Sequence, residues 1–500
     1  MFRSFKHNIW LLTALLFLFV ACQSDKEPKM TYPEGEIPVT TASDEAMQEF
    51  LKGLELLDHG NAQEARAYFD KALELDPDFV SAQMYRANSA SSAKDWAENR
   101  DKFLAMRDKA NEGEALMMDI VEANLAVDQE KRKNLTLKLT EKYPSSARAV
   151  SNLAGYYSSM DETAKARETW AKAIEINPDF IPAMNSLGFS YLFTTPKDYT
   201  KAQKYFEMAV EKIPQSSRAQ INLGDCYRAQ GDLQKALGSY LKAAELDPND
   251  DVALSKAGHA NSFLGNLTAA RENYRNSRAV SEFGLGSYNF EANTFILEGD
   301  HEKALAYLQE AIEEVDQKDV PASNKLWTKM GLTSNCAAIA MHTGDSEALK
   351  GYVAEMQPMS DQMIEEVGAA FFTMNQRANM HFWEAMSSAT AGDFEEAAAT
   401  AELIKTDLEL SDDPNKLRPY HQVHAYVNFQ QGNYEKALEH MAELDPDDVY
   451  NKYWMAKAYK NLGDNEKANK LFEEIVNDNF NSVQYVLILG EAREMLASMS

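Results

Sequence analysis

The chain reads "INLGDCYRAQGDLQKALGSYLKAAELDP" from Ile221 to Pro248, and the spacing of its small residues recurs along the sequence. Gly224 is followed by Gly231 seven positions later and by Ala236 twelve positions later. Anchors at positions 154, 188, 224, 258 and 292 lie 34, 36, 34 and 34 residues apart, a period that predicts a repeat protein. The same three-part spacing returns at Gly53, Gly60 and Ala65; Gly258, Gly265 and Ala270; Ala292, Gly299 and Ala304; Ala385, Gly392 and Ala397; Ala425, Gly432 and Ala437; and Ala456, Gly463 and Ala468.

Each unit reads as two helices joined by a tight turn. The first helix ends at Gly231, because glycine adopts the left-handed conformation that most residues avoid. The second carries Ala236 and Tyr240 on one face and ends before Pro248. Small residues at positions 224 and 236 let the two helices approach closely. The residue after the turn is usually Asp or Asn, which can cap the second helix: Asn61, Asp232, Asn266, Asp300, Asp345, Asp393, Asn433 and Asp464.

This pattern resembles the tetratricopeptide repeat family. In the opening unit the resemblance rests on Leu223, Gly224, Tyr227, Gly231, Ala236, Tyr240, Ala243 and Pro248. It implies an all-α fold, a right-handed superhelical solenoid of about twelve helix-turn-helix units between residues 45 and 480. Residues 482–496 are expected to form a capping helix.

The repeat spacing becomes irregular after Ala292, where successive anchors lie 45, 48, 40 and 31 residues apart. Residues 314–327 and 406–417 interrupt the pattern. We therefore predict an N-terminal array over 45–318 and a less regular C-terminal array over 322–500, in one continuous or slightly kinked solenoid. The interruptions are either individual binding features or loops that have drifted in length.

The N-terminus is predicted to lie outside the fold. Residues 1–21 read as a lipoprotein signal peptide, with a basic start and an apolar run too short to span a bilayer. "FVAC" resembles the lipobox of bacterial lipoproteins, with Cys22 as the acylated residue and Phe19 where the family usually has leucine. Residues 22–44 are polar and proline-rich, which predicts a flexible tether. The alternative is an N-terminal strand packed on the body.

The residue after the lipidated cysteine bears on location. Gln23 stands where aspartate would direct a lipoprotein to the inner membrane, which favours the outer membrane of the cell envelope. Both the periplasmic face and the cell surface stay open. Several acyl chains on Cys22 would hold the chain stably at the membrane.

Composition argues against several other functions. The chain has 50 basic and 78 acidic residues, a net charge of −28, so the folded part should repel nucleic acid.

Cys226 and Cys336 occupy core positions and are expected to be buried thiols. His421 and His424 could supply half of a metal site, but no third ligand accompanies them in a motif. We expect no catalytic residues, no metal and no cofactor.

The resemblance places the binding surface on the inner face, formed by positions two, five, nine and twelve of each first helix. Carried over to this sequence, these positions are Asn185, Phe189, Ile221, Asp225, Arg228, His259, Asn289 and Asn293. Clamps for chaperone tails in this family carry lysine at position five, whereas this sequence has Ser151, Asn185 and Ile221 there. The mixed groove suits an extended polar or basic peptide, or is a solvated face without a ligand.

Two functions follow from these features. The favoured one is a membrane-anchored scaffold that binds partner proteins or peptides in its groove, since the family carries partners rather than a reaction. The alternative is a glycan-binding outer-membrane lipoprotein that resembles the starch-binding type, which embeds a few such repeats among large insertions and aromatic platforms. An enzyme is the least favoured reading.

Overall fold

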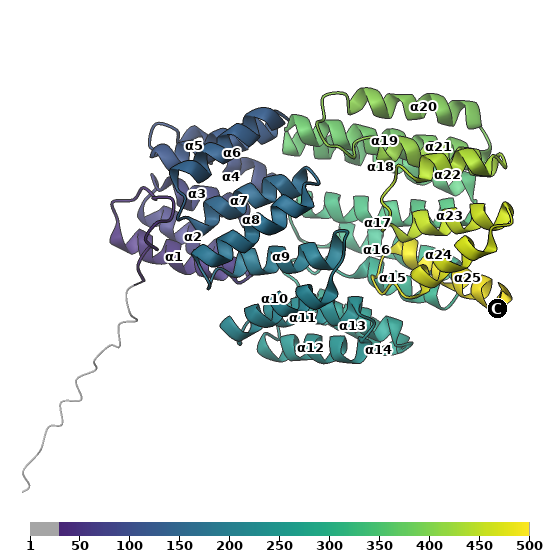
Figure 1. Cartoon of the computed structure of the whole chain (residues 1–500), viewed down its shortest axis with the longest axis horizontal. Coiled ribbons are helices and arrows are strands. Elements are labelled where there is room, and N and C mark those ends of the chain that lie inside the picture. The colour runs from purple at the N-terminus through teal and green to yellow at the C-terminus, as the bar shows by residue number, and fades with distance from the viewer. Residues whose placement is uncertain (1–29, 500) are drawn as a thin grey trace, which may run out of the picture.

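The computed structural model describes residues 30–499, and within them every regular element is a helix. Figure 1 shows the helices stacked in antiparallel pairs along a curved path. Within that range there are twelve pairs and a closing helix, which confirms the predicted all-α superhelical array. The pairs are α1 (Asp44–Asp58) and α2 (Ala62–Leu75); α3 (Val80–Asn88) and α4 (Ala93–Ala105); α5 (Glu112–Leu125) and α6 (Gln129–Lys142); α7 (Ala147–Ser159) and α8 (Thr163–Ile176); α9 (Ile181–Phe193) and α10 (Tyr199–Lys212); α11 (Ser217–Ala229) and α12 (Leu233–Leu246); α13 (Asp251–Phe263) and α14 (Leu267–Val280); α15 (Tyr288–Leu297) and α16 (His301–Gln317); α17 (Ala322–Thr343) and α18 (Ser346–Val367); α19 (Ala370–Ala391) and α20 (Phe394–Asp407); α21 (Arg418–Gln430) and α22 (Tyr434–Met441); and α23 (Val449–Asn461) and α24 (Asn465–Val476), followed by α25 (Val483–Met499).

The close approach of paired helices depends on the anchor glycines. A Cβ added at Gly224 would lie 2.6 Å from the Tyr240 ring, and one at Gly188 would lie 2.7 Å from the Phe206 ring. In both pairs the aromatic ring of the second helix packs directly on the glycine of the first. The recurring glycine and aromatic residue are therefore one packing feature, because the ring fills the space that a side chain would occupy.

The predicted capping residues behave in two ways. Five of the eight accept a hydrogen bond from the first turn of the second helix: Asn61, Asp232, Asp300, Asp345 and Asp464. The side chains of Asn266, Asp393 and Asn433 make no such bond, so the prediction is wrong at these three positions. The amides of Asn266 and Asn433 donate instead to Asn261 and Gln431.

Three long helices explain the irregular spacing after Ala292. Helices α17, α18 and α19 each contain 22 residues, whereas both helices of the pair α11 and α12 contain 13 or 14. The loop 318–321 separates α16 from α17 where we placed the boundary between arrays. The largest apolar core extends from Tyr288 to Ala492 across that loop, so the packing does not divide there.

Residues 30–43 pack against the repeats, although they contain no helix or strand. Ile37 is 5% exposed and lies in a core with Leu116 and Leu139. Thr40 donates a hydrogen bond of 2.7 Å to Glu114, and the Glu36 carboxylate accepts one of 3.1 Å from the Ala147 amide. The predicted tether over 22–44 is therefore wrong for residues 30–43, because their apolar side chains find a core and their polar groups find partners. The alternative of a packed segment holds there, without the strand.

The signal peptide over 1–21 and the lipidation residue Cys22 lie outside the described residues. Between Met30 and Met499, no helix is both long enough and apolar enough to cross a bilayer.

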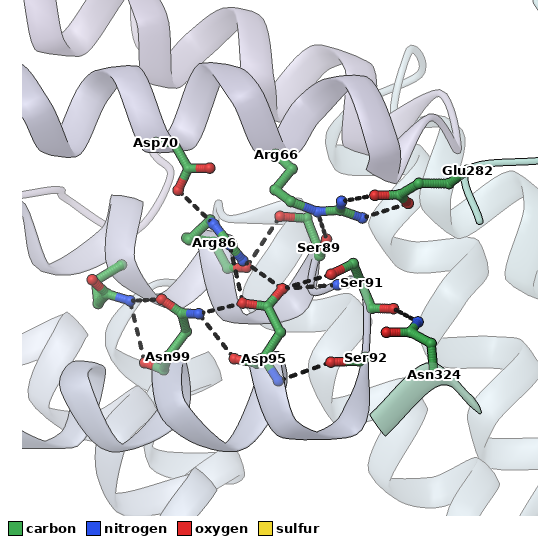
Figure 2. Close-up of polar contacts among 11 residues, drawn as sticks. Arg66, Asp70, Arg86, Ser89, Ser91, Ser92, Asp95, Asn99, Glu282 and Asn324 are labelled. Carbon is green, nitrogen blue, oxygen red and sulfur yellow. Dashed lines mark hydrogen bonds and ion pairs between the residues drawn. The ribbon is translucent and has the colours of Figure 1, made fainter. Parts of the chain in front are cut away.

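The superhelix brings helices that are distant in sequence into contact. α18 packs against α4, α19 against α5, and α25 against α15. Figure 2 shows a polar network at a further junction, centred on Arg86 and its two carboxylate partners, Asp70 and Asp95. From the same region Arg66 pairs with Glu282 at 2.7 Å, and the Ser91 carbonyl accepts a bond from Asn324 at 3.0 Å. Helix α2 of the first pair is thereby tied to the loop before α15, and the turn between α3 and α4 of the second pair is tied to α17.

Candidate functional site

The eight residues predicted to line the groove lie on four successive first helices, α9, α11, α13 and α15. Neighbouring helices are linked directly, since the Asn222 amide donates to the Asn185 side chain at 3.1 Å. Asn185, Phe189 and Asn289 are half-buried. The other five are buried within the chain: Ile221, Asp225, Arg228, His259 and Asn293.

Asp225 is the centre of a buried charge cluster. Its carboxylate accepts hydrogen bonds from Tyr240 Oη at 2.7 Å, Arg228 at 3.1 Å and Lys256 Nζ at 2.9 Å. Burial alone would raise the pKa of Asp225, but the charges of Arg228 and Lys256 and the Tyr240 hydrogen bond bring it below its ordinary value. The carboxylate is therefore ionised and fully engaged inside the protein. Ile221 packs between helices in a core with Tyr240.

A segment of the same chain, residues 478–482, lies against this face. Asn481, in the turn between α24 and α25, accepts a hydrogen bond from Asn293 Nδ2 at 2.9 Å. Its own amide lies 3.0 Å from Tyr274 Oη and 3.2 Å from His259 Nδ1. Burial, reinforced by the charges of Arg228 and Lys256, lowers the pKa of His259 well below its ordinary value. The imidazole is therefore neutral at pH 7 and can accept the Asn481 N–H.

Phe480, one residue earlier, makes the apolar part of the contact. The Arg228 guanidinium lies 4.4 Å from the centre of the Phe480 ring, in the arrangement of a cation–π pair. The edge of Phe193 packs on the same ring at 5.1 Å, and Phe193 in turn stacks on Phe189. Five of the predicted groove residues thus face or support the chain's own residues 478–482: Phe189, Asp225, Arg228, His259 and Asn293.

The sequence contained a signal for this contact that we did not use. Residues 477–482, "NDNFNS", form a polar stretch with one aromatic residue between two apolar helices. Nothing local says where such a stretch will lie, because its partners are about 190 to 290 positions earlier in the sequence. Whether the eight groove residues bind a second protein stays a prediction.

Sequence reasoning also missed the inner face of the C-terminal array. Applying the same position rule to the anchors Ala385, Ala425 and Ala456 selects twelve residues, among them Met386, Gln422, Tyr426 and Tyr450. These four residues line one cavity between α19, α21 and α23, away from residues 478–482. The rule places these four on the inner face but does not separate them from the eight others that it selects, because the cavity depends on how the three helices pack.

The described side chains show no arrangement typical of a metal centre. Within residues 30–499, no group of three or more His, Cys, Asp or Glu side chains is placed to hold an ion. His421 and His424 are joined by His440, whose Nδ1 lies 3.0 Å from His421 Nδ1. Cys226 and Cys336 are buried free thiols, and burial raises their pKa to about 11 and about 12. Neither thiol has the low pKa of a reactive cysteine.

Comparison with protein families agrees with this geometry. Models described as tetratricopeptide repeat match residues 50–114, 147–180, 197–251, 285–314 and 428–492. The matched segments include the pairs α3–α4, α7–α8, α11–α12 and α23–α24, in both predicted arrays.

Individual relatives match parts of the chain. Anaphase-promoting complex subunit CDC16 of Saccharomyces cerevisiae is 27% identical over 124 residues, 25% of this chain and 14% of that protein. Superkiller complex protein 3 of Mus musculus is 27% identical over 248 residues, 46% of this chain and 15% of that protein. The matched region is thus a small part of these longer proteins. A solved tetratricopeptide repeat protein from Parabacteroides merdae is 14% identical, with 58% of this chain and 100% of that chain covered at a TM-score of 0.34. From the family matches and the glycine-to-aromatic packing, the matched segments of this chain are tetratricopeptide repeats.

Proposed function

We propose that this protein is a membrane-anchored scaffold at the bacterial cell envelope, which binds extended segments of partner proteins on the inner face of its repeats. The observation that carries the proposal is the binding of residues 478–482 in cis. That segment is held by side-chain amides, a cation–π pair and a neutral imidazole, which are groups that recognise an extended peptide. The inner face is therefore chemically suited to hold polypeptide.

The relatives give independent support for a scaffold. By their names, CDC16 and superkiller complex protein 3 are components of multiprotein complexes. Residues 30–499 form a continuous array of helix pairs, and we propose that the chain likewise assembles partners and performs no catalysis. A net charge of −28 favours partners with basic segments.

The glycan-binding alternative is less well supported. It requires exposed aromatic platforms, and among the described residues Phe193 and Tyr199 are the exposed large aromatic side chains, at 44% and 36%. Phe193 is already engaged with Phe480. No large insertion interrupts the helix pairs between Asp44 and Met499.

Because residues 30–43 pack on the repeats, a lipid anchor at Cys22 would be joined to the folded part by a short segment. Seven residues lie between Cys22 and Met30, and the eight Cα-to-Cα steps of an extended chain reach at most about 28 Å. An anchor of this length would hold the first repeats close to the membrane. We propose the outer membrane as the location, with the periplasmic face and the surface distinguished by whether protease added to intact cells digests the repeats.

Replacing Cys22 tests the anchor. Cys22→Ser should abolish incorporation of a labelled fatty acid and release the protein from the membrane fraction, because the thioether bond requires the sulfur. Cys226→Ser is the matched control: its thiol is buried, and the variant should stay labelled and membrane-bound. Continued labelling of Cys22→Ser would show that the lipobox assignment is wrong.

Affinity capture tests the scaffold. The tagged protein should recover a reproducible set of proteins from membranes solubilised in mild detergent, after cross-linking in intact cells. Cross-links from residues of the inner face to the recovered proteins support the proposal. Recovery of glycan instead of protein would favour the alternative.

A further inference from the structure

The C-terminal array contains a cavity of about 170 Å³ on its inner face. Met386 of α19, Tyr426 of α21 and Trp454 of α23 form apolar walls. The cavity is not reached by residues 478–482, which lie against α9, α11, α13 and α15. The inner face is therefore occupied in one part of the array and hollow in another.

Two buried polar atoms beside the cavity have no partner in residues 30–499. One is Nε of Arg418, and the other is Oδ1 of Asn451, a residue that is 94% buried. Other polar groups of both side chains have partners: Arg418 Nη1 contacts Asp445 at 3.5 Å, and Asn451 Nδ2 donates to the carbonyls of Met441 and Asp445. Neither atom is open to solvent in this conformation, and leaving a buried donor and a buried acceptor unpaired is unfavourable, so a ligand toward which both side chains turn would be stabilised. A peptide group has this pair of functions, because its carbonyl accepts and its N–H donates.

The size of the cavity defines the side chain that such a peptide would place in it. An apolar protein cavity of about 150 Å³ is large enough to bind benzene. The 170 Å³ beside Trp454 therefore accommodates one aromatic ring. Met386 and Met441 contribute polarisable thioethers at its walls, which make favourable contacts with rings.

The charged residues that line the cavity favour a particular residue next to the aromatic side chain of the bound segment. Asp445 and Asp448 line the cavity together with a single cation, Arg418, so the rim has excess negative charge. A lysine or arginine next to the aromatic residue would lie near these carboxylates.

We infer that this cavity is an anchor site for a partner's extended segment, which inserts one aromatic side chain between α19, α21 and α23 and carries a basic residue beside it. The inference rests on the proposed function and adds the place and the chemistry of recognition. The aromatic ring packs on Tyr426 and Trp454, and its peptide group pairs with Arg418 and Asn451.

Methionine methyl NMR of the full-length protein in detergent tests the site. The probe is N-acetyl-Phe-Lys-amide, with N-acetyl-Ala-Lys-amide and N-acetyl-Phe-Glu-amide as comparisons. The Met386 and Met441 methyl signals, assigned through Met→Leu variants, should shift saturably with the Phe-Lys probe. The shifts should be weaker with the Phe-Glu probe, and the difference between the Phe-Lys and Phe-Glu probes should decrease at high salt. The Ala-Lys probe should cause no shift. Intermolecular NOEs from the phenyl protons to these methyls should place the ring in the cavity.

A blocking variant and its control complete the test. Gln422 is half-buried at the cavity and makes no side-chain hydrogen bond to a described residue, so Gln422→Trp should fill the mouth and weaken the Phe-Lys probe at least tenfold. Gln63→Trp, at an exposed position on α2, should leave binding unchanged. Absence of NOEs to both methyls, or equal shifts with Ala-Lys, would overturn the inference. If Gln422→Trp blocks no probe yet affinity capture still recovers partners, the anchor site fails and the scaffold stands.

Discussion

At the scale of single residues, the anchor glycine matters through its missing side chain. The Tyr240 ring rests on Gly224, and the Tyr240 hydroxyl donates to Asp225, so one aromatic residue connects the packing of the pair to the charge cluster of the inner face. The same contact recurs in other pairs, for example between Gly53 and Phe69. The glycine at this position is therefore needed for the short distance between the two helices, and not for the conformation of a turn.

Alanine substitutions at two glycines should have opposite effects on stability. In Gly224→Ala the new Cβ would lie 2.6 Å from the Tyr240 ring, and overpacking of this kind costs about 1–3 kcal/mol. Gly238 is exposed within α12 with no atom near its Cβ position, so Gly238→Ala should stabilise that helix by up to about 1 kcal/mol. Urea unfolding, with hydrogen exchange across α11 and α12, measures both. Equal effects of the two variants would contradict the packing role of Gly224.

At the scale of helices, α21 and α22 meet through three imidazoles. The His424 and His440 rings stack with centroids 5.2 Å apart, and His421 and His440 approach through their Nδ1 atoms. Burial lowers the pKa of all three histidines, the mutual repulsion of their charges lowers it further at His424 and His440, and the nearby Lys405 acts in the same direction. Glu443 opposes this effect at His421 and His440, and Glu402 does so at His424.

The stability of this helix pair should decrease in acid. A base whose pKa is lower in the folded state contributes stability above its unfolded pKa, about 6.5 for histidine, and loses it as the pH falls below that value. The hydrogen-exchange protection factors of α21 and α22, which are corrected for the intrinsic exchange rate at each pH, should therefore fall between pH 7 and pH 5, and His440→Gln should reduce that fall. Because His259 and His301 also have lowered pKa values, the informative quantity is the difference between variant and wild type. His59→Gln, at the end of α1, is the control that should change nothing in α21 and α22.

At the scale of the whole molecule, the curvature of the array brings its last turn onto its middle. Phe480 and Asn481 make the central contacts, and around them Thr195 bonds to Asp447 and Lys197 pairs with Asp447 at 3.3 Å. Partly exposed ion pairs of this kind contribute little, so the Phe480 and Asn481 contacts should dominate the closure.

Removing those contacts should open the superhelix without unfolding its helices. The double variant Phe480→Ala, Asn481→Ala loses the cation–π pair with Arg228 and the bonds to Asn293 and Tyr274. Its radius of gyration, measured by small-angle X-ray scattering, should increase while circular dichroism keeps the helical content. Asn461→Ala, an exposed position on α23, should change neither. An unchanged radius in the double variant would show that the closure does not depend on this segment.

The sequence alone determined the helix pairs, because their code is local. Gly224, Gly231, Ala236 and Tyr240 lie within 17 positions, and the ring-on-glycine contact they encode needs no information from elsewhere in the chain. The same locality explains why the capping helix was predictable, and why the burial of Cys226 could be predicted from its position beside a core residue.

Tertiary structure alone decided what occupies the inner face. Each helix pair is rotated slightly relative to the one before, and these rotations add up along the array. The sequence of a single pair does not determine the total rotation, so it does not predict where residues 478–482 will lie. The same sum sets α4 against α18 and leaves a cavity between α19, α21 and α23. Residues 30–43 were mistaken for a tether for the same reason: Ile37 becomes a core residue through Leu116 and Leu139, which lie about 80 to 100 positions later in the sequence.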